Sequence, residues 1–171
     1  MLTATGDDPT TVVVVPYDDR FRAHFETLNR EWIERLFTME PRDWAALRDP
    51  RGAFVEGGGE VLFALVGGEV CGTCALRRME EGTFELCKLA VRPDARGRGL
   101  GDLLLRAAVD AARARGGRRV RLFASTVLAP ALALYRKHGF VTTRVGPHPE
   151  YARTNLEMVL ELARAPVPEP R

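Results

Sequence analysis

The feature that most constrains this chain is a glycine-rich turn, RGRGLG at residues 96–101. The segment 83–91 before it has the pattern of a strand, and the segment from Leu100 to about Arg115 carries apolar or small residues at helical spacing. Because three glycines remove side chains where the helix begins, its first N–H groups are open, and the positive end of the helix dipole reinforces them. With the two arginines of the turn, these groups form an anion site that suits a diphosphate.

Two other phosphate-binding patterns do not fit this turn. The P-loop requires Lys followed by Ser or Thr after its last glycine, whereas Gly101 is followed by Asp102 and Leu103. The dinucleotide fingerprint requires G-x-G-x-x-G and an acidic residue about twenty positions later, and the chain has neither. On these residues alone, a simple tight turn with solvated arginines stays an alternative.

Two motifs, in this order, resemble the GCN5-related N-acetyltransferase (GNAT) superfamily. LAVRP at 89–93 followed by RGRGLG at 96–101 resembles its acyl-CoA-binding motif, and ALALYRKHGF at 131–140 resembles its second signature. The motifs stand at the family's usual separation, and the resemblance covers roughly residues 10–163. It implies an α/β fold with a mixed sheet of about seven strands and four helices, the GNAT-like acyl-CoA N-acyltransferase fold, whose central strands splay apart at the CoA site.

The resemblance implies acetyl-CoA as cosubstrate, no metal, and direct transfer of the acetyl group to the primary amine of a small molecule in a ternary complex. Tyr135 matches the family's tyrosine, which protonates the leaving thiolate; periodicity alone leaves a packing role equally open. Glu85 is the best-placed general base, although water or a purely structural Glu stays open. The expected cofactor contacts lie on the strand end, the turn and the second motif: Leu89, Ala90, Val91, Arg96, Gly97, Arg98, Gly99, Leu100, Gly101, Ser125, Pro130 and Tyr135.

One position departs from the family pattern. Many relatives carry an asparagine about seven residues before the tyrosine, where Leu128 stands here. Its hydrogen bond to the cofactor would be missing, and Ser125 or Thr126 are the candidates to replace it. His148 and Tyr151, before the last strand, are weaker candidates for the acceptor site.

Length and composition indicate one globular domain. The 171 residues carry 46% hydrophobic and 28% charged residues and a net charge of +2. We expect a domain at 10–163, a disordered leader at 1–9 and a proline-rich tail at 164–171. No apolar run reaches the roughly 20 residues of a membrane helix, and no signal segment opens the chain, so a cytoplasmic location is expected. Family members often form homodimers.

The remaining patterns predict the rest of the sheet and its helices. Strands are expected at 11–16, 61–66, 69–78, 118–125, 141–145 and 155–162, helices at 20–37 and 40–47, and a loop at 48–52. On the first helix, Trp32 and Phe37 are interpreted as core and Asn29 as part of a solvated face. Glu85 is expected to share a strand face with Cys87 and Leu89.

Other readings of single features are weaker. Cys71 and Cys74 have the spacing of a metal or redox pair, but on a strand they are expected on opposite faces, as buried thiols. The arginines between 113 and 121 are interpreted as a solvated face, with the CoA 3′-phosphate as a further contact, and not as a nucleic-acid site. A protein or peptide acceptor and a non-catalytic acyl-CoA sensor stay open as alternatives to a small-molecule enzyme.

Overall fold

The structure, a computed structural model, describes residues 9–163. The tail expected at 164–171 and all but the last residue of the leader expected at 1–9 lie outside the described residues. One seven-stranded sheet forms the centre, in the order β1-β2-β3-β4-β5-β7-β6. The strands are β1 (Val12–Pro16), β2 (Glu60–Val66), β3 (Glu69–Arg78), β4 (Thr83–Val91), β5 (Arg119–Ala124), β6 (Val141–Val145) and β7 (Leu156–Glu161).

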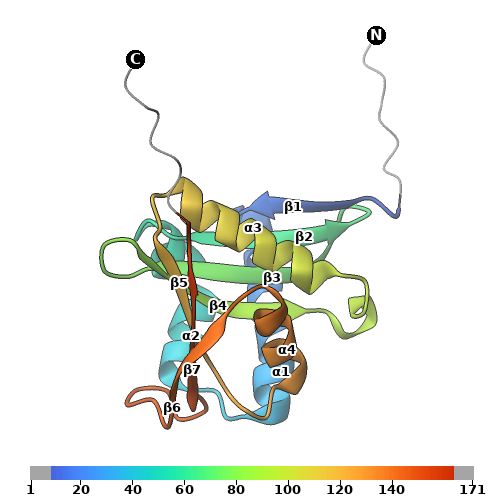
Figure 1. The fold of residues 1–171 in the computed structure, drawn as a ribbon. Coiled ribbons are helices and arrows are strands. Elements are labelled where there is room, and N and C mark those ends of the chain that lie inside the picture. Colours follow the sequence, from blue (N-terminus) through green and yellow to red (C-terminus); the bar gives the residue numbers. More distant parts are fainter. Residues whose placement is uncertain (1–8, 164–171) are drawn as a thin grey trace, which may run out of the picture.

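Helices cover both faces of this sheet (Figure 1). One face carries α3, and the opposite face carries α1 and α2, while α4 lies at the end where β4 and β5 part. The helices are α1 (Arg22–Leu36), α2 (Pro41–Arg48), α3 (Leu100–Ala114) and α4 (Ala129–Lys137). Seven strands and four helices within the described residues match the predicted fold class.

The two central strands are paired over only part of their length. β4 runs parallel to β5 and pairs with it from Thr83 to Glu85, opposite Arg119 to Arg121, whereas the other neighbouring strands are antiparallel. Beyond Glu85 no further β4–β5 pair forms in the described part of the chain. The strands therefore splay, as the family resemblance predicted, and open a space between their carboxyl-terminal halves.

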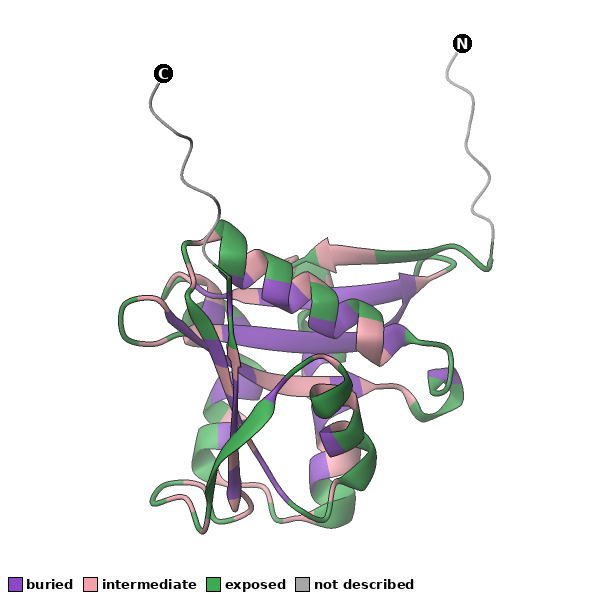
Figure 2. Ribbon diagram, in the orientation of Figure 1, coloured by how far each residue is buried: buried purple, intermediate pink, exposed green. Residues whose placement is uncertain are grey.

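The core is divided by the sheet into two layers (Figure 2). Leu104, Leu105 and Ala108 of α3 pack against one face with the apolar side chains of β3, β4 and β5. Phe25 of α1 and Leu47 of α2 pack against the other face. Because both layers pack on the same strands, helices support the splayed sheet on both of its faces.

Two predicted details are wrong because of local irregularities in the chain. The pairing of β2 with β3 shifts between Ala64 and Leu65, which moves Cys71 out of simple alternation, so Cys71 and Cys74 lie in the same core layer. Both are free and buried, as expected for structural thiols. The predicted loop at 48–52 runs into a short helical turn, Arg51–Val55, whose Phe54 is buried.

A second irregularity lies in β4 itself. The pairing with β3 passes from Cys87 opposite Ala75 to Ala90 opposite Thr73, so β4 has an extra residue at this bulge. Lys88, within the bulge, has a φ of 56°. The bulge reverses the alternation: Leu89 packs with the α3 layer and Cys87 with the α1–α2 layer, which corrects the prediction that they share a face.

Among the helices of residues 9–163, none has both the length and the apolar character needed to span a membrane.

Candidate functional site

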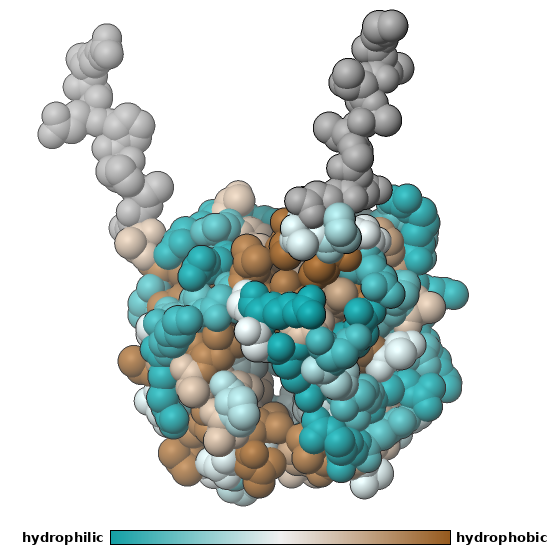
Figure 3. Space-filling model, turned by 90° about the vertical axis from the view of Figure 1, so that its right-hand side faces the viewer, coloured by the Kyte–Doolittle hydropathy of each residue, from teal (hydrophilic) through white to brown (hydrophobic). Residues whose placement is uncertain are grey.

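A cavity of about 980 Å³ extends from the glycine turn, between the splayed strands, to α1 and α2. The surface is hollowed on the side of the molecule that carries α4 and the turn (Figure 3). Every cofactor residue predicted from the sequence lines this cavity except Arg98, and so does Glu85. Arg98 is exposed.

The turn presents a run of free backbone donors at one end of the cavity. None of the N–H groups of residues 97–102 donates to an acceptor within the described part of the chain; Leu103 is the first to do so, to the Gly99 carbonyl. Gly97 and Gly99 both have a φ of 78°, which only glycine adopts without strain, and a side chain there would meet open space. Free donors at the start of a 15-residue helix fit the diphosphate of an acyl-CoA.

Arg96 is already engaged in this structure. Its guanidinium donates to the Glu31 carboxylate on α1 at 2.9 Å and to the Val91 carbonyl at 3.2 Å. These bonds connect the turn to α1. The charge of Arg96, which the sequence analysis assigned to phosphate binding, is therefore partly neutralised by Glu31.

α4 packs closely on the start of α3. A Cβ added to Gly101 would lie 3.1 Å from Leu134, so the glycine permits the approach of the two helices. Asp102 then accepts from Lys137 and lies 2.8 Å from His138 Nε2. These contacts fix α4, and with it Tyr135, beside the cofactor turn.

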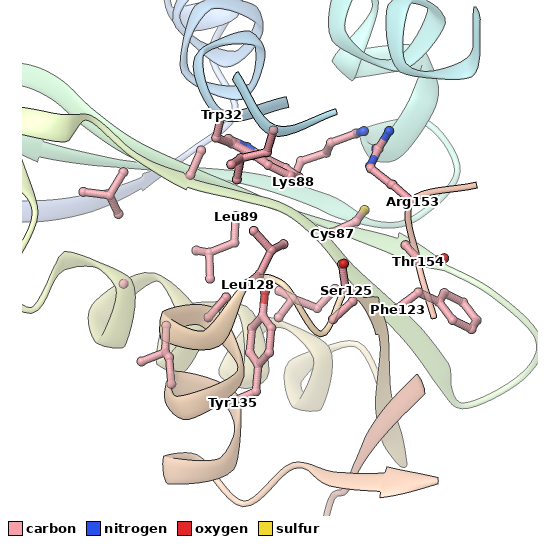
Figure 4. A pocket seen from close by; sticks show the side chains of 18 of the residues that line it. Trp32, Cys87, Lys88, Leu89, Phe123, Ser125, Leu128, Tyr135, Arg153 and Thr154 are labelled. Carbon is pink, nitrogen blue, oxygen red and sulfur yellow. The ribbon is translucent and has the colours of Figure 1, made fainter. Parts of the chain in front are cut away.

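Tyr135 points from α4 into the space between the splayed strands (Figure 4). Burial raises the pKa of its phenol well above the ordinary value, and the nearby Cys74 and Cys87 add to the shift. The phenol therefore keeps its proton throughout the physiological range.

Glu85 lies on the α1–α2 side of β4, at the last residue that pairs with β5. Its side chain is only 7% exposed and is 3.3 Å from Arg77 Nη1. Arg77 in turn lies over the Phe54 ring. Glu85 is thus a buried carboxylate held at the cavity wall by one cation, which suits a base and also suits a structural ion pair.

The surroundings of Leu128 bear on its departure from the family pattern. Thr126 exchanges two hydrogen bonds with Asn155, its N–H donating at 3.0 Å and its hydroxyl accepting at 3.0 Å. Ser125 is 5% exposed and lines the cavity, with its hydroxyl 3.4 Å from the Val127 nitrogen. Of the two candidate replacements, Ser125 is the one that lies on the cavity wall.

The far end of the cavity has apolar walls contributed by α1. Trp32 and Phe37, interpreted from the sequence as core, both line it and pack edge to face with ring centroids 6.3 Å apart. Asn29, predicted to be solvated, is fully buried: its amide donates to the Phe25 carbonyl and accepts from the Trp32 indole. It fixes the orientation of the indole, which is the physical reason for a buried amide at this place.

A buried ionic cluster at this end was not found from the sequence. Asp43 of α2 accepts from Lys88 Nζ at 2.7 Å and from both terminal nitrogens of Arg153 at 2.6 Å. Burial alone would raise the pKa of Asp43, but the bonds from Arg153 and Lys88 outweigh it and hold that pKa well below its ordinary value. The one available signal was that Lys88 is one of only two lysines in an arginine-rich chain.

The two weaker candidates of the 148–151 loop, His148 and Tyr151, occupy different environments. Tyr151 lines the cavity and stacks under the Arg42 guanidinium at 4.2 Å. His148 does not line it; its Nδ1 accepts from the backbone N–H groups of Glu150 and Tyr151, and its ring packs on Phe123. Its Nδ1 is therefore occupied as an acceptor within its own loop.

The arginines between 113 and 121 do not contribute to the cavity lining. Four of them form ion pairs with acidic partners: Arg113 with Asp110, Arg115 with Glu60, Arg119 with Glu161 and Arg121 with Glu80. Four of the five arginines of this face are therefore ion-paired, and the contact with the CoA 3′-phosphate suggested from the sequence finds no support in the lining of the cavity.

A family model described as Acetyltransferase (GNAT) family matches residues 16–140, well over half of the chain. The chain belongs to the GNAT acetyltransferase family. This confirms the predicted family, the enzyme class and acetyl-CoA as the cosubstrate of that class.

Solved structures show the same fold. A GNAT-family acetyltransferase from Staphylococcus aureus Mu50 superposes with a TM-score of 0.81 at 17% identity, covering 90% of this chain and 100% of that one. The yncA protein from Salmonella typhimurium, solved with its cofactor acetyl-CoA, superposes with a TM-score of 0.70 at 22% identity, covering 94% and 99%.

Curated relatives match over a shorter stretch. The mycothiol acetyltransferase of Clavibacter michiganensis subsp. michiganensis is 46% identical over 63 residues, which are 37% of this chain and 21% of that protein. That of Corynebacterium glutamicum (strain R) is 36% identical over 81 residues, 47% and 28%. The matched region thus spans only about a quarter of these relatives' length.

Proposed function

We propose that this protein transfers an acetyl group from acetyl-CoA to the primary amine of a small molecule, directly, within a ternary complex. One observation carries the proposal. A single cavity joins the free donors of residues 97–102, Tyr135 and Glu85, between two strands that have parted. The partial likeness to mycothiol acetyltransferases supports a small molecule as the acceptor.

Different parts of the chain would bind different parts of acetyl-CoA. The turn at 96–101 would hold the diphosphate, and the backbone of Leu89, Ala90 and Val91 the pantetheine arm, with Ser125 and Pro130 on the opposite wall. An N–H group of this strand end would also stabilise the oxyanion at the thioester carbon. Acetyl-CoA supplies the thioester; every other function is assigned to the chain itself.

Three proton transfers accompany the step. Glu85, directly or through a water, first takes one proton from the acceptor's ammonium group. The neutral amine then attacks the thioester carbon, a C–N bond forms and the C–S bond breaks, the nitrogen loses its second proton to water, and Tyr135 Oη gives its proton to the leaving thiolate. A thiol ionises near 8.5 and an amine of the lysine type near 10.4, so the amine is the group that needs a base at neutral pH.

Thiol release from acetyl-CoA, measured against a panel of amines, amino acids, polyamines, aminoglycosides and short peptides, tests this function. Turnover with one class of small amine, reduced about a hundredfold or more in Tyr135→Phe with acetyl-CoA binding retained, is the expected result. Turnover with peptides alone would move the proposal to a protein acceptor. Acetyl-CoA binding by calorimetry without turnover for any acceptor would favour a sensor.

A further inference from the structure

We propose that Lys88 and Arg153 form a carboxylate-binding subsite at the far end of the cavity, and that the acceptor is therefore an α-amino acid with an apolar side chain. This inference rests on the proposed function, since it names the class of amine that the enzyme acetylates. Figure 4 shows the two side chains converging from β4 and from the segment before β7.

The N–H donors of the cluster outnumber the acceptor positions of Asp43, which is the carboxylate of the cluster that lines the cavity. Asp43, Lys88 and Arg153 are 2%, 9% and 10% exposed at their side chains, and both cations bind the same Asp43 carboxylate. In the described part of the chain Lys88 Nζ has no other partner, so two of its three N–H bonds are unused. A second carboxylate, Glu40, lies 3.7 Å from Arg153 Nη1 but does not line the cavity.

The other cations of this part of the cavity wall are each paired with an acidic side chain. Arg42 pairs with Glu150 and Arg77 with Glu85, whereas Arg35 and Arg96 share Glu31. The ammonium of Lys88 is nearly buried and has unused donors, so an added anion would gain hydrogen bonds there without displacing one already made.

The backbone of Lys88 supplies an independent reason. Among residues 9–163 it is the one non-glycine residue with a positive φ, 56°, a conformation in which an ordinary side chain costs about 1–2 kcal/mol. A glycine would relieve that cost, yet a lysine stands at the bulge. Strain of this kind concentrates at ligand sites, where the side chain is needed in one place. Here it turns the ammonium toward the cavity, one residue before the strand end assigned to pantetheine.

The side chains around the cluster indicate which kind of carboxylate-bearing amine the cavity would bind. The Arg153 guanidinium lies over the Trp32 ring at 5.9 Å, Phe37 packs edge to face on that ring, and Leu36 and Phe123 also line the cavity. A carboxylate on Lys88 would leave an apolar side chain near the Trp32 and Phe37 rings. Glu85, three residues earlier on β4, is then the carboxylate available to the amine. Such a molecule is an apolar α-amino acid.

Calorimetry tests the subsite without requiring turnover. L-Phenylalanine and L-leucine, their amides, and the decarboxylated amines phenethylamine and isoamylamine are titrated into the protein, with and without saturating CoA. The acids are expected to bind at least about tenfold more tightly than the amides and amines, the worth of a hydrogen bond to a charged group. In Lys88→Met that preference is expected to vanish, with the affinity for amides unchanged.

Two further variants separate recognition from folding. Lys88→Arg keeps the charge and is expected to keep most of the preference. Arg119→Met is the control, because Arg119 is a cation that is 51% exposed on β5 and does not line the cavity. It is expected to bind all six compounds like the unaltered protein.

Each contrary outcome has its own meaning. Equal affinity for acids and amides, absence of binding by both acids, or an equal loss for all compounds in Lys88→Met would overturn the subsite. Tighter binding of the matching aminophosphonates would overturn the carboxylate assignment in favour of a phosphate-type anion. Acid binding without any acetyl transfer would overturn the proposed function and support the subsite. Acetyl transfer to amines without preference for acids would overturn the subsite and support the proposed function.

Discussion

The two ends of the cavity are built in opposite ways. The end proposed to hold the cofactor, here the cofactor end, consists largely of one continuous stretch, from β4 through the glycine turn into α3, and its donors are left open. The end proposed to hold the acceptor, here the acceptor end, joins segments 45 and 110 residues apart, on Lys88, Asp43 and Arg153, and most of its charges are bonded to one another. Loss of a group at the cofactor end should therefore affect binding, whereas loss at the acceptor end should also affect folding.

The largest expected effect is that of Asp43→Asn at the acceptor end. Without this carboxylate two nearly buried cations face each other, and we expect the free energy of unfolding to fall by about 3–5 kcal/mol at pH 7. Chemical denaturation at pH 7 measures it. Asp110→Asn, which breaks an exposed pair with Arg113, is the control and should leave stability nearly unchanged.

The pH dependence of the stability of Asp43→Asn provides a second test of the cluster. Because the pKa of Asp43 is lower in the folded protein than in the unfolded chain, its contribution is full above the ordinary pKa of about 3.8 and is lost as the pH falls toward the folded value. The stability gap between the unaltered protein and Asp43→Asn should therefore narrow below about pH 4. A gap no larger than that of Asp110→Asn would mean that the cluster does not stabilise the fold. A large gap that does not change with pH would mean that the ionised form of Asp43 is not the source of the stabilisation.

The next effect, on rate, is that of Glu85→Gln between the two ends. If Glu85 is the base, kcat/KM at pH 7 should fall about a hundredfold with little change in acetyl-CoA affinity. The deficit should shrink as the pH approaches that of the amine's own ionisation, near 10, because the acceptor then loses its proton without help. A deficit that persists unchanged at high pH would indicate that Glu85 serves only to hold Arg77.

The contrast between the two ends of the cavity also explains which features could be predicted from the sequence. The strands at 60–66, 69–78 and 83–91 and the helix from Leu100 follow from local periodicity and turn chemistry, and the cofactor turn is itself a local motif. The cluster on Asp43 depends on which distant segments the sheet order brings together, and no spacing encodes that. The errors at Cys71 and Leu89 share one cause: each bulge adds a residue and reverses a strict alternation.

A smaller effect distinguishes the glycines of the cofactor turn. Gly97→Ala and Gly99→Ala should each cost about 1 kcal/mol of stability, since both have a φ of 78° and open space around the missing side chain. They should also raise the Kd of acetyl-CoA, because the free N–H groups are reoriented. Gly116→Ala is a matched control with the same φ and the same open space at the other end of α3. An equal rise in Kd for all three variants would show that the turn has no special part in binding.

The smallest expected effect is that of Leu128→Asn, which restores the asparagine that many family members carry. One added hydrogen bond to the cofactor contributes roughly 0.5–1 kcal/mol, so the Kd of acetyl-CoA should fall by a factor of about two to five. Ala129→Asn, at an exposed position that does not line the cavity, is the control and should leave the Kd unchanged. If Leu128→Asn also changes nothing, the buried hydroxyl of Ser125 already meets the cofactor's need, and Ser125→Ala should then raise the Kd by the same small factor. The pair of variants thus shows whether Leu128→Asn or the Ser125 hydroxyl supplies this hydrogen bond to the cofactor.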